Sequence, residues 1–297
     1  MSACDDRTIS RRGASRLAAL LELGKLRLST LAIVAVLAGI ALGAQVPLAT
    51  HTVVLTGVGT LLVAVAGNAL NMLIERERDK RMARTAGRPL PTGRLLPIEV
   101  AGFGIVCAVL GLAALWFGSN PLATALCATI LFTYVLVYTP LKPVTTLNTL
   151  VGAVPGALPP VVGYAAAAGY VDTRALALFL ILFFWQIPHF LAIAWRYRED
   201  YRRGGMRMLS VVDPKGRATA VQMIVYTLAL LIVSLWPPRL LMTGDLYPLL
   251  AILLGVFFLV PVVVAAARRT DAAMRGAFLA SIVYLPLLLG AMLLDRP

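Results

Sequence analysis

Long apolar runs constrain this chain more than any other feature of its sequence. About nine of them reach the roughly 17–25 residues that a helix needs to cross a bilayer. They are expected near residues 28–46, 52–74, 97–117, 121–140, 148–168, 174–195, 219–236, 246–267 and 275–294. Hydrophobic residues make up 60% of the 297 positions and charged residues only 14%, which is outside the usual range of soluble domains. The sequence therefore predicts an all-α polytopic membrane protein, with residues 1–297 forming one domain.

The distribution of lysine and arginine predicts how these spans are oriented. If the basic segment 1–27 is inside, 24 of the 27 cationic residues fall on the inside and three fall outside, namely Arg174, Arg239 and Arg296. Cytoplasmic loops carry such an excess of cations, so we expect a cytoplasmic N-terminus. The net charge of +13 then reflects topology and affinity for the anionic lipid bilayer. No motif indicates that the chain binds nucleic acid.

Two groups of acidic residues lie where apolar runs end on the inside. Asn71, Glu75 and Asp79 are spaced four residues apart at the end of the second run, so they form one stripe on a helix. Glu199 and Asp200 follow the sixth run. Because four runs separate the two groups, we expect two similar four-helix halves plus a ninth helix, enclosing a central cavity with inside loops at the active site.

The stripe on the second run has two interpretations. An acidic helix end in solvent commonly forms ion pairs with its own neighbours. However, the stripe continues back to Asn68, at membrane depth, where polar groups are costly and usually face an interior cavity. Carboxylate and amide oxygens suit a Mg²⁺ ion that also holds a phosphate, and Arg84, Arg88 and Lys142 could neutralise the rest of a diphosphate. The residues favour a Mg²⁺–diphosphate site that opens into an apolar chamber.

The fifth run contains residues that disfavour a continuous helix. Gly152 and Gly156 are followed by Pro159 and Pro160, a combination that predicts a kink or break. Small residues also allow two helices to cross closely. Given the adjoining polar Asn148, we expect a widened wall of the cavity.

His189 is an isolated histidine in the sixth run. It precedes Asp200 by eleven residues, which places it about 16 Å deeper along a helix. Two roles stay open at this depth: contact with a bound substrate, including a metal that it carries, or a hydrogen-bonded packing role.

Four blocks of the sequence resemble the UbiA-type intramembrane prenyltransferases. The pattern N-x-x-x-E-x-x-x-D-x-x-M-x-R-T-x-x-R-P-L-P, from Asn71 to Pro91, is similar to the signature of this family. Its M-x-R-T-x-x-R-P part resembles the branch that makes heme O. The K-x-R at 25–27 and the blocks at 138–164 and 184–211 resemble further segments of that branch, in the same order along the chain.

The resemblance implies a cofactor, two substrates and a set of site residues. In this family two acidic motifs together hold Mg²⁺ on the diphosphate of a polyprenyl donor; the matching residues, with metal-binding and catalytic roles, are Asn71, Glu75, Asp79 and Asp200. The branch implies transfer of the farnesyl group of farnesyl diphosphate to the C2 vinyl group of heme b, giving heme O and diphosphate. The expected substrate-binding residues are Arg84, Arg88, Tyr138, Lys142, Asn148, His189, Arg196 and Arg198.

The resemblance also implies a bacterial plasma (inner) membrane location. Heme A synthase or the assembly of a terminal oxidase would be further partners.

Two alternatives stay open. Another prenyltransferase of the same superfamily would act on a quinone or chlorin precursor, and its second acidic motif would be expected as a spaced pair of aspartates rather than Glu199-Asp200. A secondary transporter also uses repeats and broken helices, but it would require a gradient and leave its substrate unchanged.

Overall fold

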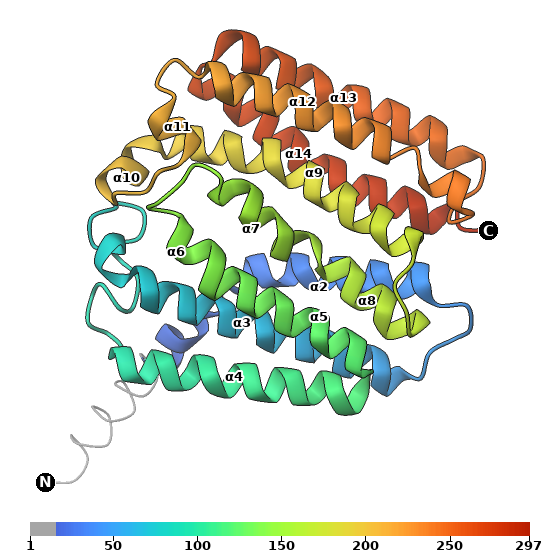
Figure 1. Cartoon of the computed structure of the whole chain (residues 1–297), viewed down its shortest axis with the longest axis horizontal. Coiled ribbons are helices and arrows are strands. Elements are labelled where there is room, and N and C mark those ends of the chain that lie inside the picture. Colours follow the sequence, from blue (N-terminus) through green and yellow to red (C-terminus); the bar gives the residue numbers. More distant parts are fainter. Residues whose placement is uncertain (1–15) are drawn as a thin grey trace, which may run out of the picture.

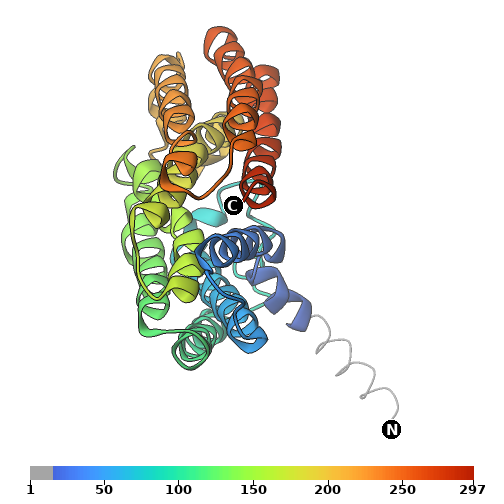
Figure 2. The same ribbon diagram turned by 90° about the vertical axis from the view of Figure 1, so that its right-hand side faces the viewer.

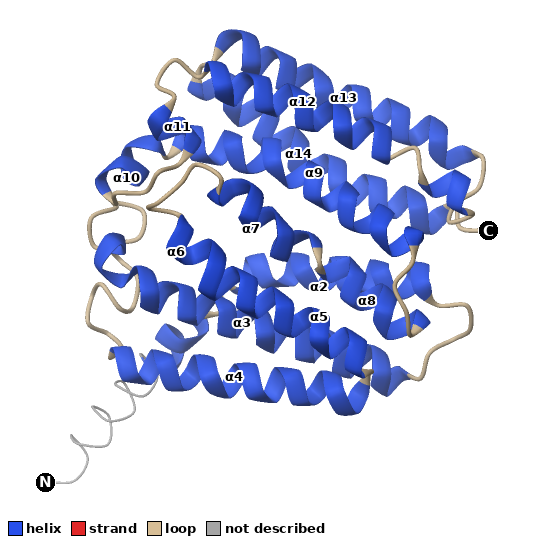
Figure 3. Cartoon of the chain, viewed as in Figure 1, coloured by secondary structure: helices blue, strands red, loops and turns tan. Residues whose placement is uncertain are grey.

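The computed structural model describes residues 16–297, with only the backbone described at 26–28. All regular structure in this part of the chain is helical, and Figure 3 shows helices joined by loops. The all-α prediction is thus confirmed. The basic segment 1–27 lies largely outside the described residues, and the single domain over residues 1–297 stays a prediction.

The helices follow the expected apolar runs closely. In chain order they are α2 (Leu26–Gly43), α3 (Thr50–Asp79), α4 (Pro97–Gly118), α5 (Pro121–Phe132), the π-helix η1 (Thr133–Tyr138), α6 (Thr139–Leu141), α7 (Asn148–Ala157), α8 (Pro159–Ala168), α9 (Thr173–Arg196), α10 (Arg198–Arg203), α11 (Leu209–Val212), α12 (Arg217–Val233), the 3₁₀ helix η2 (Pro237–Leu240), α13 (Leu246–Arg268) and α14 (Asp271–Leu294).

Eight helical segments within residues 16–297 are long and apolar enough to cross a membrane. They correspond to the second to ninth expected runs. The first run corresponds to α2, whose apolar part, Ser29–Gly43, is shorter than the others. Nine spans and a repeat of two four-helix halves therefore stay predictions, whereas a polytopic helical architecture is established.

Large apolar side chains cover the outer faces of several helices. Val109 on α4, Ile232 on α12 and Val260 on α13 are examples of exposed aliphatic residues. A soluble monomer rarely exposes apolar surface of this extent. The exposed faces therefore fit contact with lipid, as expected for an integral membrane protein.

Helix α3 extends beyond the expected run 52–74. It continues to Asp79, so Asn71, Glu75 and Asp79 lie on one uninterrupted helix. Their four-residue spacing places all three on the same face, and all three are buried. The predicted stripe is confirmed as a structural feature.

The fifth run is divided into α7 and α8, with the break at Leu158. Pro159 lacks a backbone N–H and begins the second helix, where an N–H would have no partner in any case. The predicted break is thus confirmed. The π-helical segment η1 within the fourth run was not predicted; such segments occur often at functional sites.

Helices α2 and α8 cross at very short distance. A Cβ atom at Gly163 would lie 1.9 Å from the carbonyl oxygen of Val36, and one at Gly39 would lie 2.0 Å from that of Pro160. Only glycine can occupy both positions, as in other close membrane-helix crossings. This contact fixes α2 against the broken fifth span.

The connecting segments collect at the two ends of the helices. The loop after α3, the loop between α6 and α7, and the short helices α10 and α11 lie together at one end (left in Figure 1). Figure 2 faces the opposite end and shows α12, α13 and α14 above α2 and α3. The acidic end of α3 and the end of α9 therefore reach the same face of the protein.

Candidate active site

A cavity of about 920 Å³ lies between α2, α3, η1, α7, α8, α9 and α14. Its deep part is apolar, with Ile130, Leu182 and Leu289 in the wall, whereas its mouth is charged. Most of the predicted site residues line it, namely Asn71, Glu75, Asp79, Arg84, Arg88, Tyr138, Lys142, His189 and Arg196. The cavity thus joins the acidic stripe to an apolar interior.

Asn71 has a defined amide orientation. Its Nδ2 donates to Thr139 Oγ1 at 3.0 Å, and Thr139 Oγ1 in turn donates to the carbonyl of Tyr134 at 2.8 Å. Because a hydroxyl has a single proton to donate, Thr139 can only accept from Asn71. The Oδ1 atom of Asn71 is therefore directed away from Thr139 and available as an oxygen ligand.

Glu75 on α3 forms a buried ion pair with Lys142, which directly follows α6. The distance between Glu75 Oε1 and Lys142 Nζ is 2.8 Å, and the ammonium also lies 4.6 Å from the centre of the Tyr138 ring. Burial alone would lower the pKa of Lys142, but Tyr138 and Glu75 outweigh it and raise that pKa above its ordinary value. Lys142 is therefore a permanent cation in the mouth of the cavity.

Asp79 pairs with Arg88 in the same way, one turn further along α3. Asp79 Oδ2 accepts from Arg88 at 2.7 Å, and the carboxylate is fully buried. Its other oxygen, Oδ1, has no hydrogen-bond partner among the described residues. A buried carboxylate oxygen without a partner is costly, so a cation bound there would be stabilising.

Lys25 is a third cation at this site. It lines the cavity and adopts a left-handed backbone conformation with φ 43°, which is uncommon for a residue with a side chain. Burial, followed by the charges of Arg88 and Lys142, lowers the pKa of Lys25 to about 7. The sequence places Lys25 in the K-x-R pattern, but this pattern alone does not predict Lys25 as a site residue.

Asp200 lies beside the stripe's end but does not line the cavity. Its carboxylate accepts from the backbone N–H groups of Ala83 and Arg84, at 3.1 and 3.2 Å. It therefore caps the turn after α3. Within residues 16–297 no group of three or more His, Cys, Asp or Glu side chains is placed to hold a metal. The structure brings Asn71, Glu75 and Asp79 together, but not the Asp200 carboxylate with them.

The turn that Asp200 caps also carries the Arg84 side chain. The guanidinium lies 4.7 Å from the ring centre of Tyr197 and 5.5 Å from that of Tyr201, and it donates to the Tyr201 hydroxyl at 3.3 Å. Two aromatic contacts hold the planar cation in place. Arg84 is thus positioned at the cavity mouth by a segment far away in the sequence.

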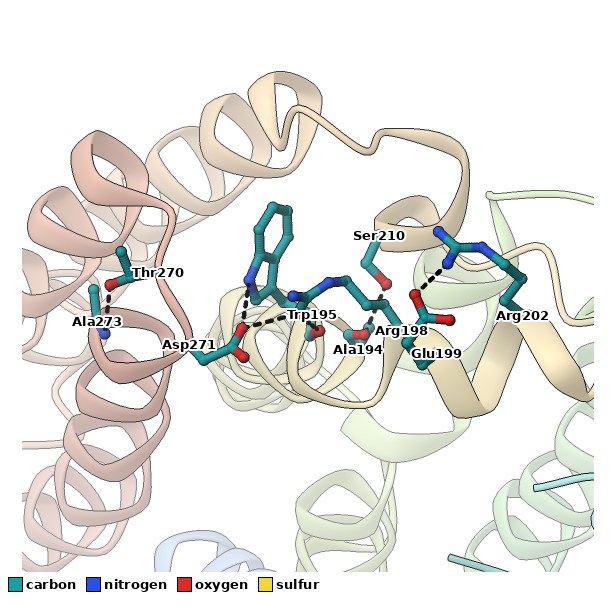
Figure 4. Close-up of polar contacts among 9 residues, drawn as sticks. All are labelled: Ala194, Trp195, Arg198, Glu199, Arg202, Ser210, Thr270, Asp271 and Ala273. Carbon is teal, nitrogen blue, oxygen red and sulfur yellow. Dashed lines mark hydrogen bonds and ion pairs between the residues drawn. The ribbon is translucent and has the colours of Figure 1, made fainter. Parts of the chain in front are cut away.

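Arg196 and Arg198 occupy different environments although they are two residues apart. Arg196 lines the cavity. Arg198 donates instead to Asp271 Oδ1 at 2.8 Å, and this oxygen also accepts from Trp195 Nε1 at 3.1 Å (Figure 4). Arg198, the first residue of α10, therefore ties this segment to the start of α14 and is not among the residues that line the cavity.

Asn148 likewise has a structural environment. Its Nδ2 donates to the carbonyls of Thr145 and Arg207, and the side chain is fully buried. It holds the loop between α6 and α7 against the segment after α10. Tyr138 does line the cavity, and it packs so closely on Gly152 that a Cβ there would lie 2.6 Å from its ring.

His189 projects from α9 towards α14. Its Nδ1 lies 2.7 Å from Ser281 Oγ, and its ring stacks on Trp185 with 4.9 Å between ring centres. The Phe278 ring lies 5.0 Å away on the neighbouring helix. Thr139, Tyr201 and Ser281 were not predicted as site residues, because each is defined by contacts between distant segments.

The fold and this cavity define a class of protein: an integral membrane protein of helices whose apolar chamber opens through a mouth of paired carboxylates and cations. The chain belongs to the UbiA prenyltransferase family, whose profile matches residues 32–284. The resemblance predicted from the four sequence blocks is thus confirmed.

Several relatives carry a more specific name. The protoheme IX farnesyltransferase of Solibacter usitatus (strain Ellin6076) is 49% identical over 247 residues, which cover 83% of each chain. That of Anaeromyxobacter sp. (strain Fw109-5) is 45% identical and covers 93% of this chain and 92% of its own. The human mitochondrial protoheme IX farnesyltransferase is 42% identical over 92% of this chain and 61% of its own.

Solved structures share the fold at low sequence identity. A structure of digeranylgeranylglyceryl phosphate synthase in membranes has a TM-score of 0.78 at 18% identity and covers 95% of this chain and 98% of its own. A UbiA homolog from Archaeoglobus fulgidus bound to GPP and Mg²⁺ has a TM-score of 0.67 at 15% identity, covering 92% and 99%. These likenesses establish the fold.

Proposed function

We propose that this protein transfers the farnesyl group of farnesyl diphosphate to the C2 vinyl group of heme b, after which water adds to the resulting heme-side cation and loses a proton, giving heme O and diphosphate. One observation carries the proposal: two buried carboxylate–cation pairs lie at the mouth of a cavity of about 920 Å³ with an apolar interior. Such a cavity suits two amphiphiles, each with an anionic end. Relatives that are 49% and 45% identical are named protoheme IX farnesyltransferase, which supports this pair of substrates.

The oxygen atoms at the mouth fit a hard divalent cation. Asp79 Oδ1 is buried without a hydrogen-bond partner among the described residues. Glu75 Oε1 is buried and contacts Lys142 through the ion pair. Asn71 Oδ1 is free of Thr139. Mg²⁺ takes such oxygens and usually keeps water or phosphate in its remaining positions. We therefore assign Mg²⁺ binding to Asn71, Glu75 and Asp79.

Asp200 completes this proposed set from the second acidic motif. Each of its oxygens accepts one backbone N–H, and a carboxylate oxygen has a second lone pair for a further partner. Asp200 can thus cap the turn before Arg84 and still present oxygen to a metal or its water. The Mg²⁺ ion, when bound, supplies positive charge to the leaving diphosphate.

The internal ion pairs explain how the two buried carboxylates are compensated before substrate arrives. Lys142 neutralises Glu75, and Arg88 neutralises Asp79. When a diphosphate enters together with a divalent ion, the carboxylates can turn to the metal and the two cations to the phosphate oxygens. Breaking the allylic C–O bond increases the negative charge on the diphosphate, and cations already in place stabilise that charge.

The apolar depth of the cavity would hold the farnesyl chain. Once diphosphate leaves, the farnesyl cation must meet the vinyl group of heme before it meets water. Apolar walls exclude water and so protect a reactive intermediate. Arg196 at the rim is a candidate partner for a heme propionate, whereas we assign Arg198 and Asn148 to structural contacts because of their partners.

The charged mouth lies at the end where the loop after α3 and helices α10 and α11 gather (Figure 1). This end carries the arginine-rich segments of the chain, so the positive-inside tendency favours a cytoplasmic mouth in the bacterial inner membrane. Heme A synthase or terminal oxidase assembly would then take up the product.

Extracted heme from cells with and without this protein tests the function. Expression in cells that lack their own heme O synthesis should produce a heme whose mass exceeds that of heme b by a farnesyl group and one hydroxyl group. A transporter would leave heme unchanged. Prenylated 4-hydroxybenzoate or naphthoate in place of prenylated heme would assign a quinone precursor instead.

A further inference from the structure

Ser281 on α14 determines which nitrogen of His189 carries a proton. Its Oγ lies 2.6 Å from the carbonyl oxygen of Phe278 and 2.7 Å from His189 Nδ1. Two oxygen atoms this close require the hydroxyl proton between them. Since Ser281 has only this proton, it accepts from the histidine, and Nδ1 is the donor.

The other ring nitrogen, Nε2, therefore has a free lone pair in the neutral imidazole. No described residue forms a hydrogen bond to Nε2. This atom is also not fully buried, because it is not one of the described buried side-chain atoms without a partner. His189 lines the cavity. Trp185 fixes the ring plane by stacking, and its own Nε1 donates to the Ser281 carbonyl at 2.8 Å. The ring is thus held from two sides with an unused electron pair.

We propose that His189 Nε2 is an axial ligand to the iron of the heme acceptor and that Ser281 is a positioning residue that fixes its tautomer. This inference rests on the proposed function, since it needs heme in the cavity. Imidazole nitrogen is a common axial ligand of heme iron. Histidines that bind metals usually donate their other N–H to a neighbouring acceptor, which sets the tautomer and the ring orientation.

The rest of the wall suits a porphyrin held in this way. Phe278, Ile282 and Leu285 of α14 line the cavity beside the histidine, and they offer an apolar face to the ring. Arg196 lies seven residues after His189 on α9, two turns and about 10 Å nearer the mouth on the same helix face. An iron ligand in the depth and a cation at the rim would orient the propionates towards the mouth.

The test uses heme b and the purified full-length protein in nanodiscs, without farnesyl diphosphate and with an affinity tag free of histidine. The wild type should give the absorption and electron paramagnetic resonance spectra of histidine-ligated heme. His189→Ala should lose this signature, and added imidazole should restore it. The chain has two histidines, so His51→Ala is the matched control and should keep the wild-type spectra.

A measurement on the unsubstituted chain keeps the proposal falsifiable if His189→Ala does not fold. With ¹⁵N-labelled histidine, pulsed electron paramagnetic resonance of the ferric complex should show coupling between iron and ¹⁵N. The same coupling should persist in His51→Ala. An uncoupled iron, or unchanged spectra in a folded His189→Ala variant, would overturn the assignment of the ligand.

Ser281→Ala tests the positioning role separately. The variant should keep the histidine-ligated spectrum but bind heme about 10–100-fold more weakly, and Ser281→Thr should restore affinity because it keeps the hydroxyl. Unchanged affinity in Ser281→Ala would overturn that role. Wild-type protein that makes heme O without histidine ligation would refute this inference alone, whereas wild-type protein that binds no heme and makes no heme O would refute the proposed function.

Discussion

Lys142 Nζ lies 2.8 Å from Glu75 Oε1, with the lysine side chain 13% exposed and the glutamate side chain 7% exposed. This pair joins the α6–α7 loop to α3 at the mouth of the cavity. Removing one member of a buried pair leaves the other charge uncompensated, which costs about 3–5 kcal/mol. Replacing both members by neutral groups is often much less costly.

Stability and activity should therefore respond differently to substitutions of this pair. Lys142→Met and Glu75→Gln should each lower the unfolding temperature, and the Glu75→Gln/Lys142→Met double variant should recover much of the loss. All three variants should lack turnover, because Glu75 binds Mg²⁺ and Lys142 binds the diphosphate in the proposed reaction. Thermal unfolding in detergent alongside heme O production measures this. Simply additive losses of stability would show that the two charges are not coupled.

Asp79→Asn and Asp200→Asn should both lower turnover, but each variant also disturbs a different structural contact. Asp79→Asn keeps the shape but weakens the ion pair with Arg88 and the binding of a cation, so turnover should fall on the order of 10²–10³-fold. Asp200→Asn keeps one acceptor for the turn at Ala83 and Arg84. We expect Asp200→Asn to require a higher Mg²⁺ concentration for turnover, as its proposed role at the metal predicts. Normal Mg²⁺ dependence with weaker diphosphate binding would show that Asp200 acts only as a cap of the turn.

Arg196 and Arg198 form a matched pair for testing where heme binds. Arg196→Gln should raise the KM for heme more than the KM for farnesyl diphosphate, since Arg196 faces the cavity. Arg198→Gln removes the contact with Asp271, so it should lower stability and leave both KM values near those of the wild type. Steady-state kinetics with each substrate varied decide between them. Equal effects of both variants on both substrates would indicate general electrostatics.

Lys25 predicts a specific pH dependence of diphosphate binding. Its pKa is lowered to about 7, so in the free site the lysine is charged below pH 7 and increasingly neutral above it. A bound diphosphate favours the charged form and raises this pKa. Binding should therefore take up a proton above pH 7, and affinity should fall as the pH rises through 7.

Lys25→Arg provides the control, because arginine stays charged throughout this range. Diphosphate itself titrates, but it does so equally with both proteins. Calorimetry of inorganic diphosphate binding in buffers of different ionisation enthalpy should show extra proton uptake in the wild type only. Identical proton uptake in the wild type and in Lys25→Arg would contradict the lowered pKa.

The local features of the site could be predicted from the sequence. Four-residue spacing alone places Asn71, Glu75 and Asp79 on one helix face, and the glycines and prolines of 152–160 predict the break between α7 and α8. Positive-inside counting predicts that the ends of α3 and α9 share one face. Each of these depends on periodicity or chain direction, which a single sequence reveals.

Contacts between distant segments could not be predicted in this way. Arg196 and Arg198 look equivalent in sequence, and only the position of Asp271 on α14 separates their roles. In sequence Asp200 resembles a carboxylate that lines the cavity, but in the structure it accepts hydrogen bonds from two backbone N–H groups of the turn after α3. The serine that holds His189 is 92 residues further along the chain, and no local pattern marks it.

The mass spectrum of heme after incubation with the purified protein tests the central claim most directly. The reaction would contain heme b, farnesyl diphosphate and Mg²⁺. One parallel sample would also contain a chelator, and another would contain 4-hydroxybenzoate in place of heme b. We predict heme O in the complete reaction, none with the chelator until Mg²⁺ is restored, and no prenylated benzoate. Prenylated benzoate without heme O, or undiminished heme O in exhaustively chelated protein, would contradict the account.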